Sequence, residues 1–141
     1  MIEIRLQIPA HADYIDIVRV CLFGIASKLR FPYEDIEDMK VAVSEACNNA
    51  VLHGSPLLHN NHIDLCFESR DNSLTIKVSN RGQPFEHSDA LESAAPLPVT
   101  DISELPTGGL GIYLMQALMD EVTVETMDKI TQVTLVKYLV V

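Results

Sequence analysis

The chain has 141 residues, of which 48% are hydrophobic, and it carries a formal net charge of -10 at pH 7. This apolar fraction at this length predicts one domain, residues 1–141, with a single core. The acidic balance argues against nonspecific, direct binding to nucleic acid, because such binding requires a basic surface that displaces counterions. A basic protein partner is favoured instead.

Residues 2–8 alternate between apolar and polar side chains, which is the period of a half-buried strand, and a proline follows. Between residues 13 and 30, apolar side chains recur at helical spacing. Phe31-Pro32 breaks this pattern before an acidic helix start at Glu34-Asp35. The sequence therefore predicts one strand followed by two helices.

The second of these helices has two distinct faces. Its buried stripe is formed by Ile36, Met39, Val43, Ala46, Cys47 and Ala50. Glu45 and Asn49 are four residues apart, so they lie one turn above the other on the opposite side. A carboxylate beside a carboxamide is a plausible Mg²⁺ and water site, because Mg²⁺ prefers oxygen ligands and retains several waters.

Four further strands are predicted at residues 62–68, 73–79, 121–127 and 131–140, with tight turns inside each pair. Between the pairs, residues 81–107 break every periodic pattern and contain four of the seven prolines, which predicts a mobile loop. The order of elements predicts an α+β fold, a two-layer sandwich with helices on one face of a mixed, mostly antiparallel sheet.

A glycine-rich segment precedes the last predicted helix. Three of the six glycines fall between positions 108 and 111, directly before apolar residues at helical spacing. Such a loop lets a polyphosphate approach the backbone N–H groups of the helix start. A glycine-rich helix start without a ligand is an equally good interpretation of this loop alone. No dinucleotide-binding strand pattern precedes it, which argues against a Rossmann site.

The cysteines and the N-terminus argue for a reduced, intracellular environment. Cys21, Cys47 and Cys66 are odd in number, widely spaced and form no C-x-x-C pair, so neither a disulfide framework nor a zinc site is indicated. No basic region leads into a long apolar stretch, and no apolar run approaches the roughly twenty residues of a membrane span. We expect a cytoplasmic protein with reduced thiols and no membrane contact.

Taken together, these segments resemble a known superfamily. Residues 45–49 resemble the N box of the ATPases that include gyrase, Hsp90, histidine kinases and MutL, and residues 108–111 resemble their last glycine box. Residues 78–85 lie where that superfamily carries its adenine-contacting box. Residues 36–47 and 108–122 look like the anti-sigma-B factor serine kinases, and this resemblance covers nearly the whole chain.

The resemblance implies ATP and Mg²⁺ as cofactors and assigns a role to individual residues. Glu45 would be the general base for the attacking hydroxyl, and Asn49 would hold Mg²⁺. The phosphates would be bound by Thr107, Gly108, Gly109 and Gly111. In this family the long loop is the lid over the nucleotide.

The base-binding residues implied by the resemblance are Asn80, Gly82 and Thr131. The superfamily usually has an aspartate where this chain has Asn80, and that carboxylate accepts a hydrogen bond from the adenine amino group. An asparagine accepts the same bond without charge assistance, which roughly halves its strength. Ile130 replaces the glycine expected before Thr131.

The resemblance implies a homodimeric anti-sigma factor in stress-response transcription regulation. It would sequester an alternative sigma factor and use Mg-ATP to phosphorylate a serine on an anti-anti-sigma factor. One alternative is a sigma-binding module without phosphotransfer, in which Asn80 has weakened the nucleotide pocket. A simple ATPase or an isolated histidine-kinase catalytic domain is disfavoured, because no separate dimerisation and phosphoacceptor segment is present.

Overall fold

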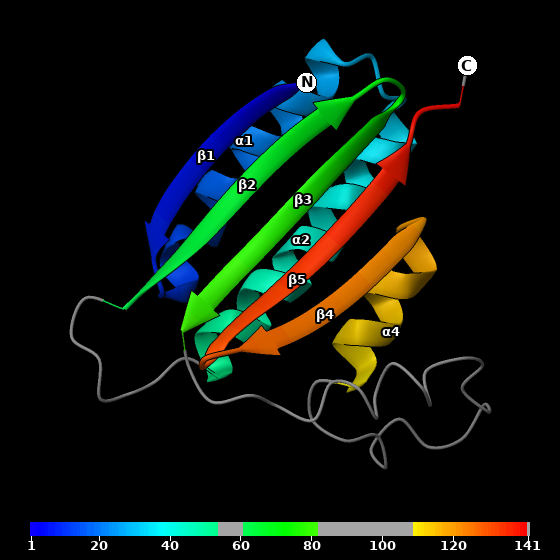
Figure 1. Cartoon of the computed structure of the whole chain (residues 1–141). Helices are drawn as coiled ribbons and strands as arrows, with labels where there is room; N and C mark the ends of the chain where they lie inside the picture. The colour runs from blue at the N-terminus through cyan, green and yellow to red at the C-terminus, as the bar shows by residue number, and fades with distance from the viewer. Residues whose placement is uncertain (54–60, 82–108, 141) are drawn as a thin grey trace.

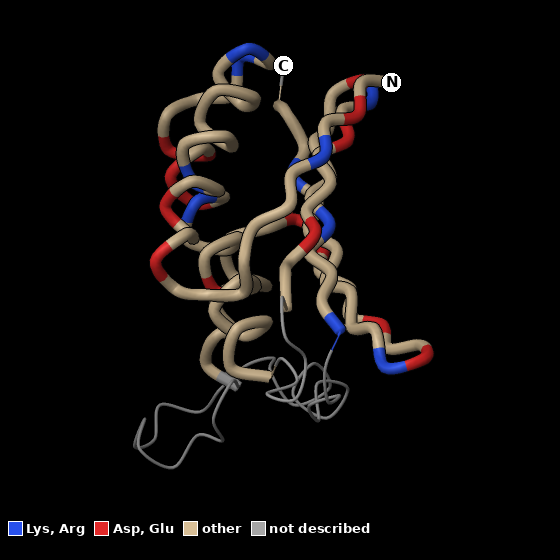
Figure 2. Tube along the Cα trace, turned by 90° about the vertical axis from the view of Figure 1, so that its left-hand side faces the viewer, with Lys and Arg blue, Asp and Glu red and all other residues tan. Residues whose placement is uncertain are grey.

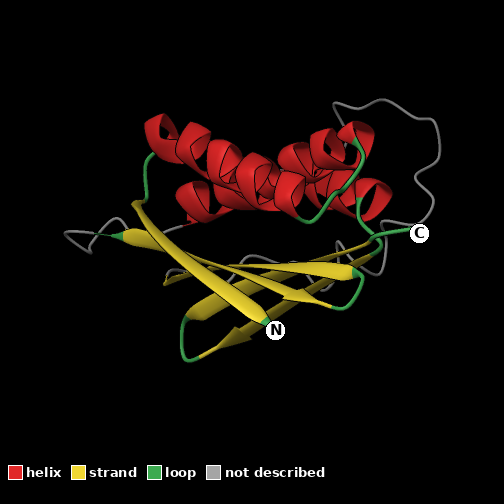
Figure 3. Cartoon of the chain, turned by 90° about the horizontal axis from the view of Figure 1, so that it is seen from above, coloured by secondary structure: helices red, strands yellow, loops and turns green. Residues whose placement is uncertain are grey.

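The fold was obtained as a computed structural model that describes residues 1–53, 61–81 and 109–140. The strands are β1 (Ile2–Pro9), β2 (His62–Arg70), β3 (Ser73–Arg81), β4 (Glu121–Met127) and β5 (Ile130–Tyr138). The helices are η1 (Ala12–Tyr14), α1 (Ile15–Lys28), α2 (Tyr33–His53) and α4 (Gly109–Leu118). The strands form one sheet in the order β1-β2-β3-β5-β4, and α1, α2 and α4 cover one of its faces (Figures 1 and 3).

The core lies between the sheet and the helices. Alternate residues of β2 and β3 point inward, and the innermost of them, such as Phe67 and Ile76, are almost completely buried. The predicted stripe of α2 faces them and includes Met39, Val43 and Cys47, each at 0% exposure. Burial raises the pKa of the Cys47 thiol to about 12, so this cysteine stays protonated within the core.

Backbone geometry explains where several elements stop. Asp128 and Lys129 both have positive φ, at 52° and 66°, which suits the tight turn that joins β4 to β5. Arg30 has a φ of 68° directly after α1, and Phe31 N–H donates to Ala26 O at 3.1 Å. This left-handed residue and its hydrogen bond close the helix C-terminus.

The predicted elements are confirmed, with changes at their ends. The helix expected from residue 13 begins at Ile15, after the short η1, and the last strand ends at Tyr138 rather than at residue 140. Every pairing between the described strands is antiparallel, so the mixed component of the predicted sheet is not found among them. The predicted loop lies outside the described residues, apart from Arg81, which ends β3.

Charged residues occur on both layers. Figure 2 shows the layers edge-on, with acidic residues spread along both of them. In the part of the chain that the structure describes, no helix is long and apolar enough to cross a membrane.

Candidate functional site

Glu45 and Asn49 of α2 face the first turn of α4. A Cβ atom added to Gly111 would lie 3.0 Å from Glu45 Oε2 and 3.5 Å from Asn49 Nδ2. The first of these separations is tighter than ordinary van der Waals contact, so a glycine is what allows α4 to begin this close to α2. The structure therefore brings together three predicted site residues that are up to 66 positions apart in the chain.

Asn49 is the most unusual residue of the site. Its side chain is 4% exposed, and its Nδ2 atom has no hydrogen-bond partner among the described residues. An unsatisfied buried amide costs roughly 1–3 kcal/mol, and such groups are rare in folded proteins. This energetic cost is understandable if the amide is bonded only when a polar ligand is present.

A second pair of predicted residues lies on the inner face of the sheet. Asn80 of β3 is directly opposite Thr131 of β5, and they are 8% and 3% exposed. Asn80 Nδ2 donates to the carbonyl oxygen of Ala50 at 3.4 Å, which links β3 to the residue that follows Asn49. Thr131 Oγ1 lies 3.2 Å from Thr126 Oγ1 of β4.

These residues stand out from the rest of the core. Within the described residues, the buried polar side chains are Ser44, Asn49, Asn80 and Thr131. Three of these four are residues that the sequence assigns to nucleotide binding. Polar groups are costly to bury, so their concentration here favours a ligand site over ordinary core packing.

The remaining predicted residues are only partly covered. Gly109 is the first residue of α4, as expected for a helix whose N-terminus faces a phosphate. Gly82, Thr107 and Gly108 lie outside the described residues, so their assignment stays a prediction.

Two residues of this region were not predicted from the sequence. Arg19 of α1 donates from Nη1 to Ser44 Oγ at 2.9 Å, and Ser44 in turn donates to Lys40 O at 2.6 Å. Together with Glu45 and Asn48, these residues line an open hollow of about 470 Å³. The only sequence signal was a serine inside an apolar stripe, because Arg19 is 25 positions away. Glu45 thus faces Gly111 on one side and borders a solvent-accessible hollow on the other.

The donor set fits a magnesium nucleotide. A carboxylate, a carboxamide and a glycine-flanked helix start are groups that hold Mg²⁺ and phosphate oxygens. A phosphate oxygen that accepts a hydrogen bond from Asn49 Nδ2 would satisfy this unpaired donor.

Comparison with known proteins agrees with this geometry. Residues 8–137 match the family described as histidine kinase-like ATPase domain. The chain belongs to this family. It is 39% identical to the serine-protein kinase RsbW of Bacillus velezensis over 137 residues, which cover 96% of this chain and 85% of that protein. The same enzyme of Staphylococcus epidermidis is 38% identical over 138 residues, with 96% and 86% covered. The similarity to these serine-protein kinases over most of both chains supports a protein-serine kinase, as the resemblance predicted.

Solved structures support the fold. The RsbU and RsbW domains of Rv1364c from Mycobacterium tuberculosis superpose with a TM-score of 0.71 at 20% identity, covering 99% of this chain and 33% of that longer one. The catalytic domain of histidine kinase ThkA gives a TM-score of 0.57 at 14% identity, covering 96% of both chains. The predicted ATPase-type sandwich is therefore confirmed.

Proposed function

We propose that this protein is an anti-sigma factor that sequesters an alternative sigma factor and uses Mg-ATP to phosphorylate a serine of an anti-anti-sigma factor. The observation that carries this proposal is the meeting of Glu45, Gly111 and the unpaired, buried Asn49. The similarity to RsbW serine-protein kinases supports a protein serine as the acceptor.

Each residue has a role that its position supports. Asn49 would hold Mg²⁺ through its side-chain oxygen, and Gly109 and Gly111 would let the phosphates approach the N–H groups of α4. When bound, Mg-ATP supplies the phosphoryl group and the metal neutralises charge during transfer. Glu45 accepts the proton of the serine hydroxyl, which can reach it from the open hollow. The resemblance adds Thr107, Gly108 and Gly82, which lie outside the described residues, to the phosphate and base contacts.

Asn80 and Thr131 bind the adenine base in this proposal. Because Asn80 Nδ2 is directed at the Ala50 carbonyl, its Oδ1 atom is the group available to accept a bond from the adenine amino group. The substitution for aspartate therefore weakens this contact but leaves an acceptor in place. The alternative of a sigma-binding module without phosphotransfer is not favoured, because the relatives are serine-protein kinases and Glu45 is positioned beside Asn49.

We propose that the protein acts in the cytoplasm as a homodimer, without direct contact to nucleic acid. An apolar groove lies between β1 and the second half of α1, and exposed Ile2 and Val20 line it. Lys28 is the one charged side chain among the described residues that border it. Two copies with a charge of -10 repel each other least through such a surface. Outside this groove the protein carries its net negative charge, which suits a basic face of the sigma factor.

The dimer can be tested by sedimentation equilibrium. We expect Val20→Glu to produce monomers, because the charge would be placed in the apolar groove. Leu52→Glu is the matched control, since Leu52 is 68% exposed, close to the 71% of Val20, but lies on α2 outside the groove. A dimer that survives Val20→Glu would contradict this interface.

The catalytic proposal is tested by titration calorimetry and phosphotransfer. We expect the protein to bind ATP in preference to GTP, in a manner that depends on Mg²⁺ and is lost in Asn49→Ala. It should then transfer the γ-phosphate of ATP to an anti-anti-sigma factor from its own organism, but not to a variant of that factor in which the acceptor serine is alanine. Binding without any transfer would reject the kinase mechanism, and absence of Mg-ATP binding would reject the site itself.

A further inference from the structure

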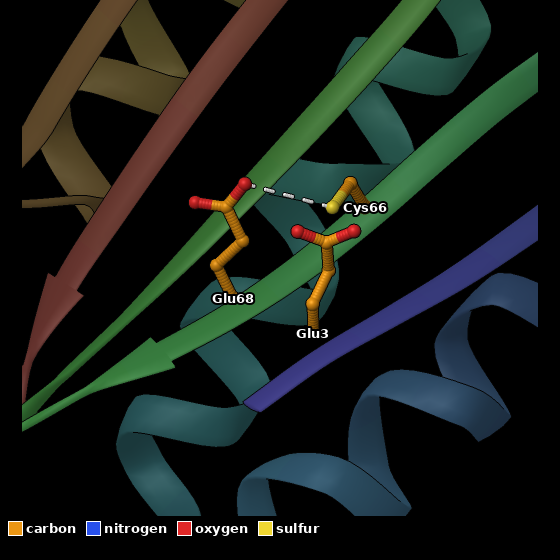
Figure 4. A group of neighbouring side chains, drawn as sticks. All are labelled: Glu3, Cys66 and Glu68. Carbon is orange, nitrogen blue, oxygen red and sulfur yellow. Dashed lines mark hydrogen bonds between the residues drawn. The ribbon is translucent and has the colours of Figure 1, made fainter. Parts of the chain in front are cut away.

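A second group of potential ligands lies on the face of the sheet that the helices leave uncovered. Glu3 of β1 and Cys66 and Glu68 of β2 point toward one another there (Figure 4). One oxygen of each carboxylate and the thiol sulfur all lie within 4.8 Å of one another. Among the described residues, this is the one place where three such groups converge.

The strand register creates this cluster. Glu3 is directly opposite Glu68, and Cys66 lies on the same face two positions along β2. Two like charges directly opposite each other in an antiparallel pair are destabilising. The arrangement is therefore unfavourable unless positive charge compensates it.

Two basic side chains balance these charges, each through a single oxygen of its carboxylate. Arg5 Nε lies 2.7 Å from Glu3 Oε1, and Lys77 Nζ lies 3.1 Å from Glu68 Oε1. Each of these bonds uses one oxygen of its carboxylate and leaves the second available. Arg5 is also 79% exposed, and exposed ion pairs contribute only about 0–1 kcal/mol, so they rearrange easily.

The ion pairs do not explain the thiol between the two carboxylates. Cys66 Sγ is 3.7 Å from Glu68 Oε1 and donates a weak hydrogen bond to it. Burial and the negative charges of Glu3 and Glu68 raise the pKa of the Cys66 thiol, so it stays protonated in this structure. A divalent cation would reverse this preference, because it attracts the thiolate and both carboxylates.

We propose that Cys66, Glu3 and Glu68 form a site for a thiolate-preferring divalent cation of the Zn²⁺ type, separate from the Mg-ATP site. The metal displaces the thiol proton, so that a thiol and M²⁺ give a metal thiolate and H⁺ with no change of oxidation state. Mg²⁺ does not suit this site, because it selects oxygen ligands and avoids sulfur.

The space around the cluster fits such an ion. Zn–S bonds of about 2.3 Å and Zn–O bonds of about 2.0–2.2 Å place tetrahedral ligands roughly 3.3–3.7 Å apart. From separations of up to 4.8 Å, the three ligand atoms must therefore close by up to about 1 Å when the ion binds. A hollow of about 730 Å³ beside Cys66 gives access to the ion and room for a water ligand. The bound ion would join the edge strand β1 to β2.

The site is tested on tag-free protein that has been stripped with a chelator and kept reduced with a phosphine. We expect Cd²⁺ to bind at one ion per chain and to produce the ultraviolet thiolate-to-metal charge-transfer band. Cys66→Ser should lose this band. Cys21→Ser, which removes the other half-buried cysteine, should retain it. Calorimetry with Zn²⁺ should show affinity falling at least ~10-fold in Glu3→Gln and in Glu68→Gln, and rising with pH as one proton is released.

Three outcomes would overturn the proposal. These are a wild-type protein without the charge-transfer band, a band that survives Cys66→Ser, and an unchanged Zn²⁺ affinity in both glutamine variants. Thermal unfolding without metal verifies that each variant is folded. Mg-ATP binding should be the same in Cys66→Ser and wild type, so this test succeeds or fails independently of the kinase proposal.

Discussion

The outer face of the sheet and the contact between α2 and α4 accommodate polar side chains in opposite ways. On the outer face these side chains bond to each other in contact with solvent, as Gln7 Nε2 does with Asp64 Oδ1 at 2.8 Å and Ser79 Oγ with Gln132 Oε1 at 3.0 Å. Where α2 meets α4, Asn49 is buried with an unpaired Nδ2 among the described residues. Polar groups that are paired and exposed cost little, whereas an unpaired buried one is retained only for a reason other than stability.

The strongest test of this contrast is Glu45→Gln, which preserves shape and removes the proton acceptor. We expect phosphotransfer to fall roughly 100- to 10,000-fold, the usual contribution of a general base, while Mg-ATP still binds. Glu34→Gln, at an exposed position in the first turn of α2 outside the hollow, is the control and should keep full activity. The measurement is single-turnover transfer from labelled ATP. If Glu45→Gln kept full activity, Glu45 would not be the general base.

Asn49→Leu tests whether function is maintained at the expense of stability. It removes the unpaired amide, so we expect the free energy of unfolding without nucleotide to rise by about 1 kcal/mol while Mg-ATP binding is lost. Gln7→Leu, on the outer face, should change stability by no more than about 0.5 kcal/mol. Urea unfolding followed by circular dichroism measures both. A destabilised Asn49→Leu protein would mean that the amide has a structural partner.

Two glycines provide a matched pair of substitutions. The Cβ of Gly111→Ala would press on Glu45 Oε2 at 3.0 Å, whereas a Cβ at Gly24 meets nothing within 4 Å. We expect Gly111→Ala to displace the Glu45 carboxylate and lower the transfer rate by roughly 10- to 100-fold. Gly24→Ala should keep the rate and stabilise α1 by about 0.5–1 kcal/mol. Equal rates in the two variants would show that the contact with Gly111 is not needed.

Local periodicity explains how much could be predicted from the sequence. The apolar stripe of α2 and the pairing of Glu45 with Asn49 on one side depend only on the spacing of residues within a helix. The contact with Gly111 also requires α4 to pack against α2, which no local pattern records. The resemblance to the kinase family provided that step.

The order of strands in the sheet shows more clearly what local sequence patterns cannot predict. Asn80 meets Thr131 only because β5, rather than β4, lies next to β3 in the sheet. Two strands joined by a tight turn look alike in sequence, so the alternation of residues cannot decide which of them is central. For the same reason the sequence did not predict the cluster of Glu3 and Cys66, since this cluster arises from the register between β1 and β2.

The smallest expected effect comes from Asn80→Asp. This substitution should strengthen the contact of the side chain with adenine and remove its hydrogen bond to α2. The carboxylate gives adenine a charge-assisted acceptor, so we expect ATP affinity to rise about 3- to 10-fold in calorimetry. It cannot donate to Ala50 O, so the nucleotide-free protein should become less stable.

Asn48→Asp is the control for this last prediction, since it adds the same charge at an exposed position next to Asn49. It should leave stability unchanged and should not strengthen ATP binding. If Asn80→Asp weakened ATP binding to the same extent as Asn48→Asp, the added charge would act only through the phosphates, and Asn80 would not contact the base. Gain of affinity together with loss of stability, found in Asn80→Asp alone, requires that the one side chain both bonds α2 and faces the nucleotide.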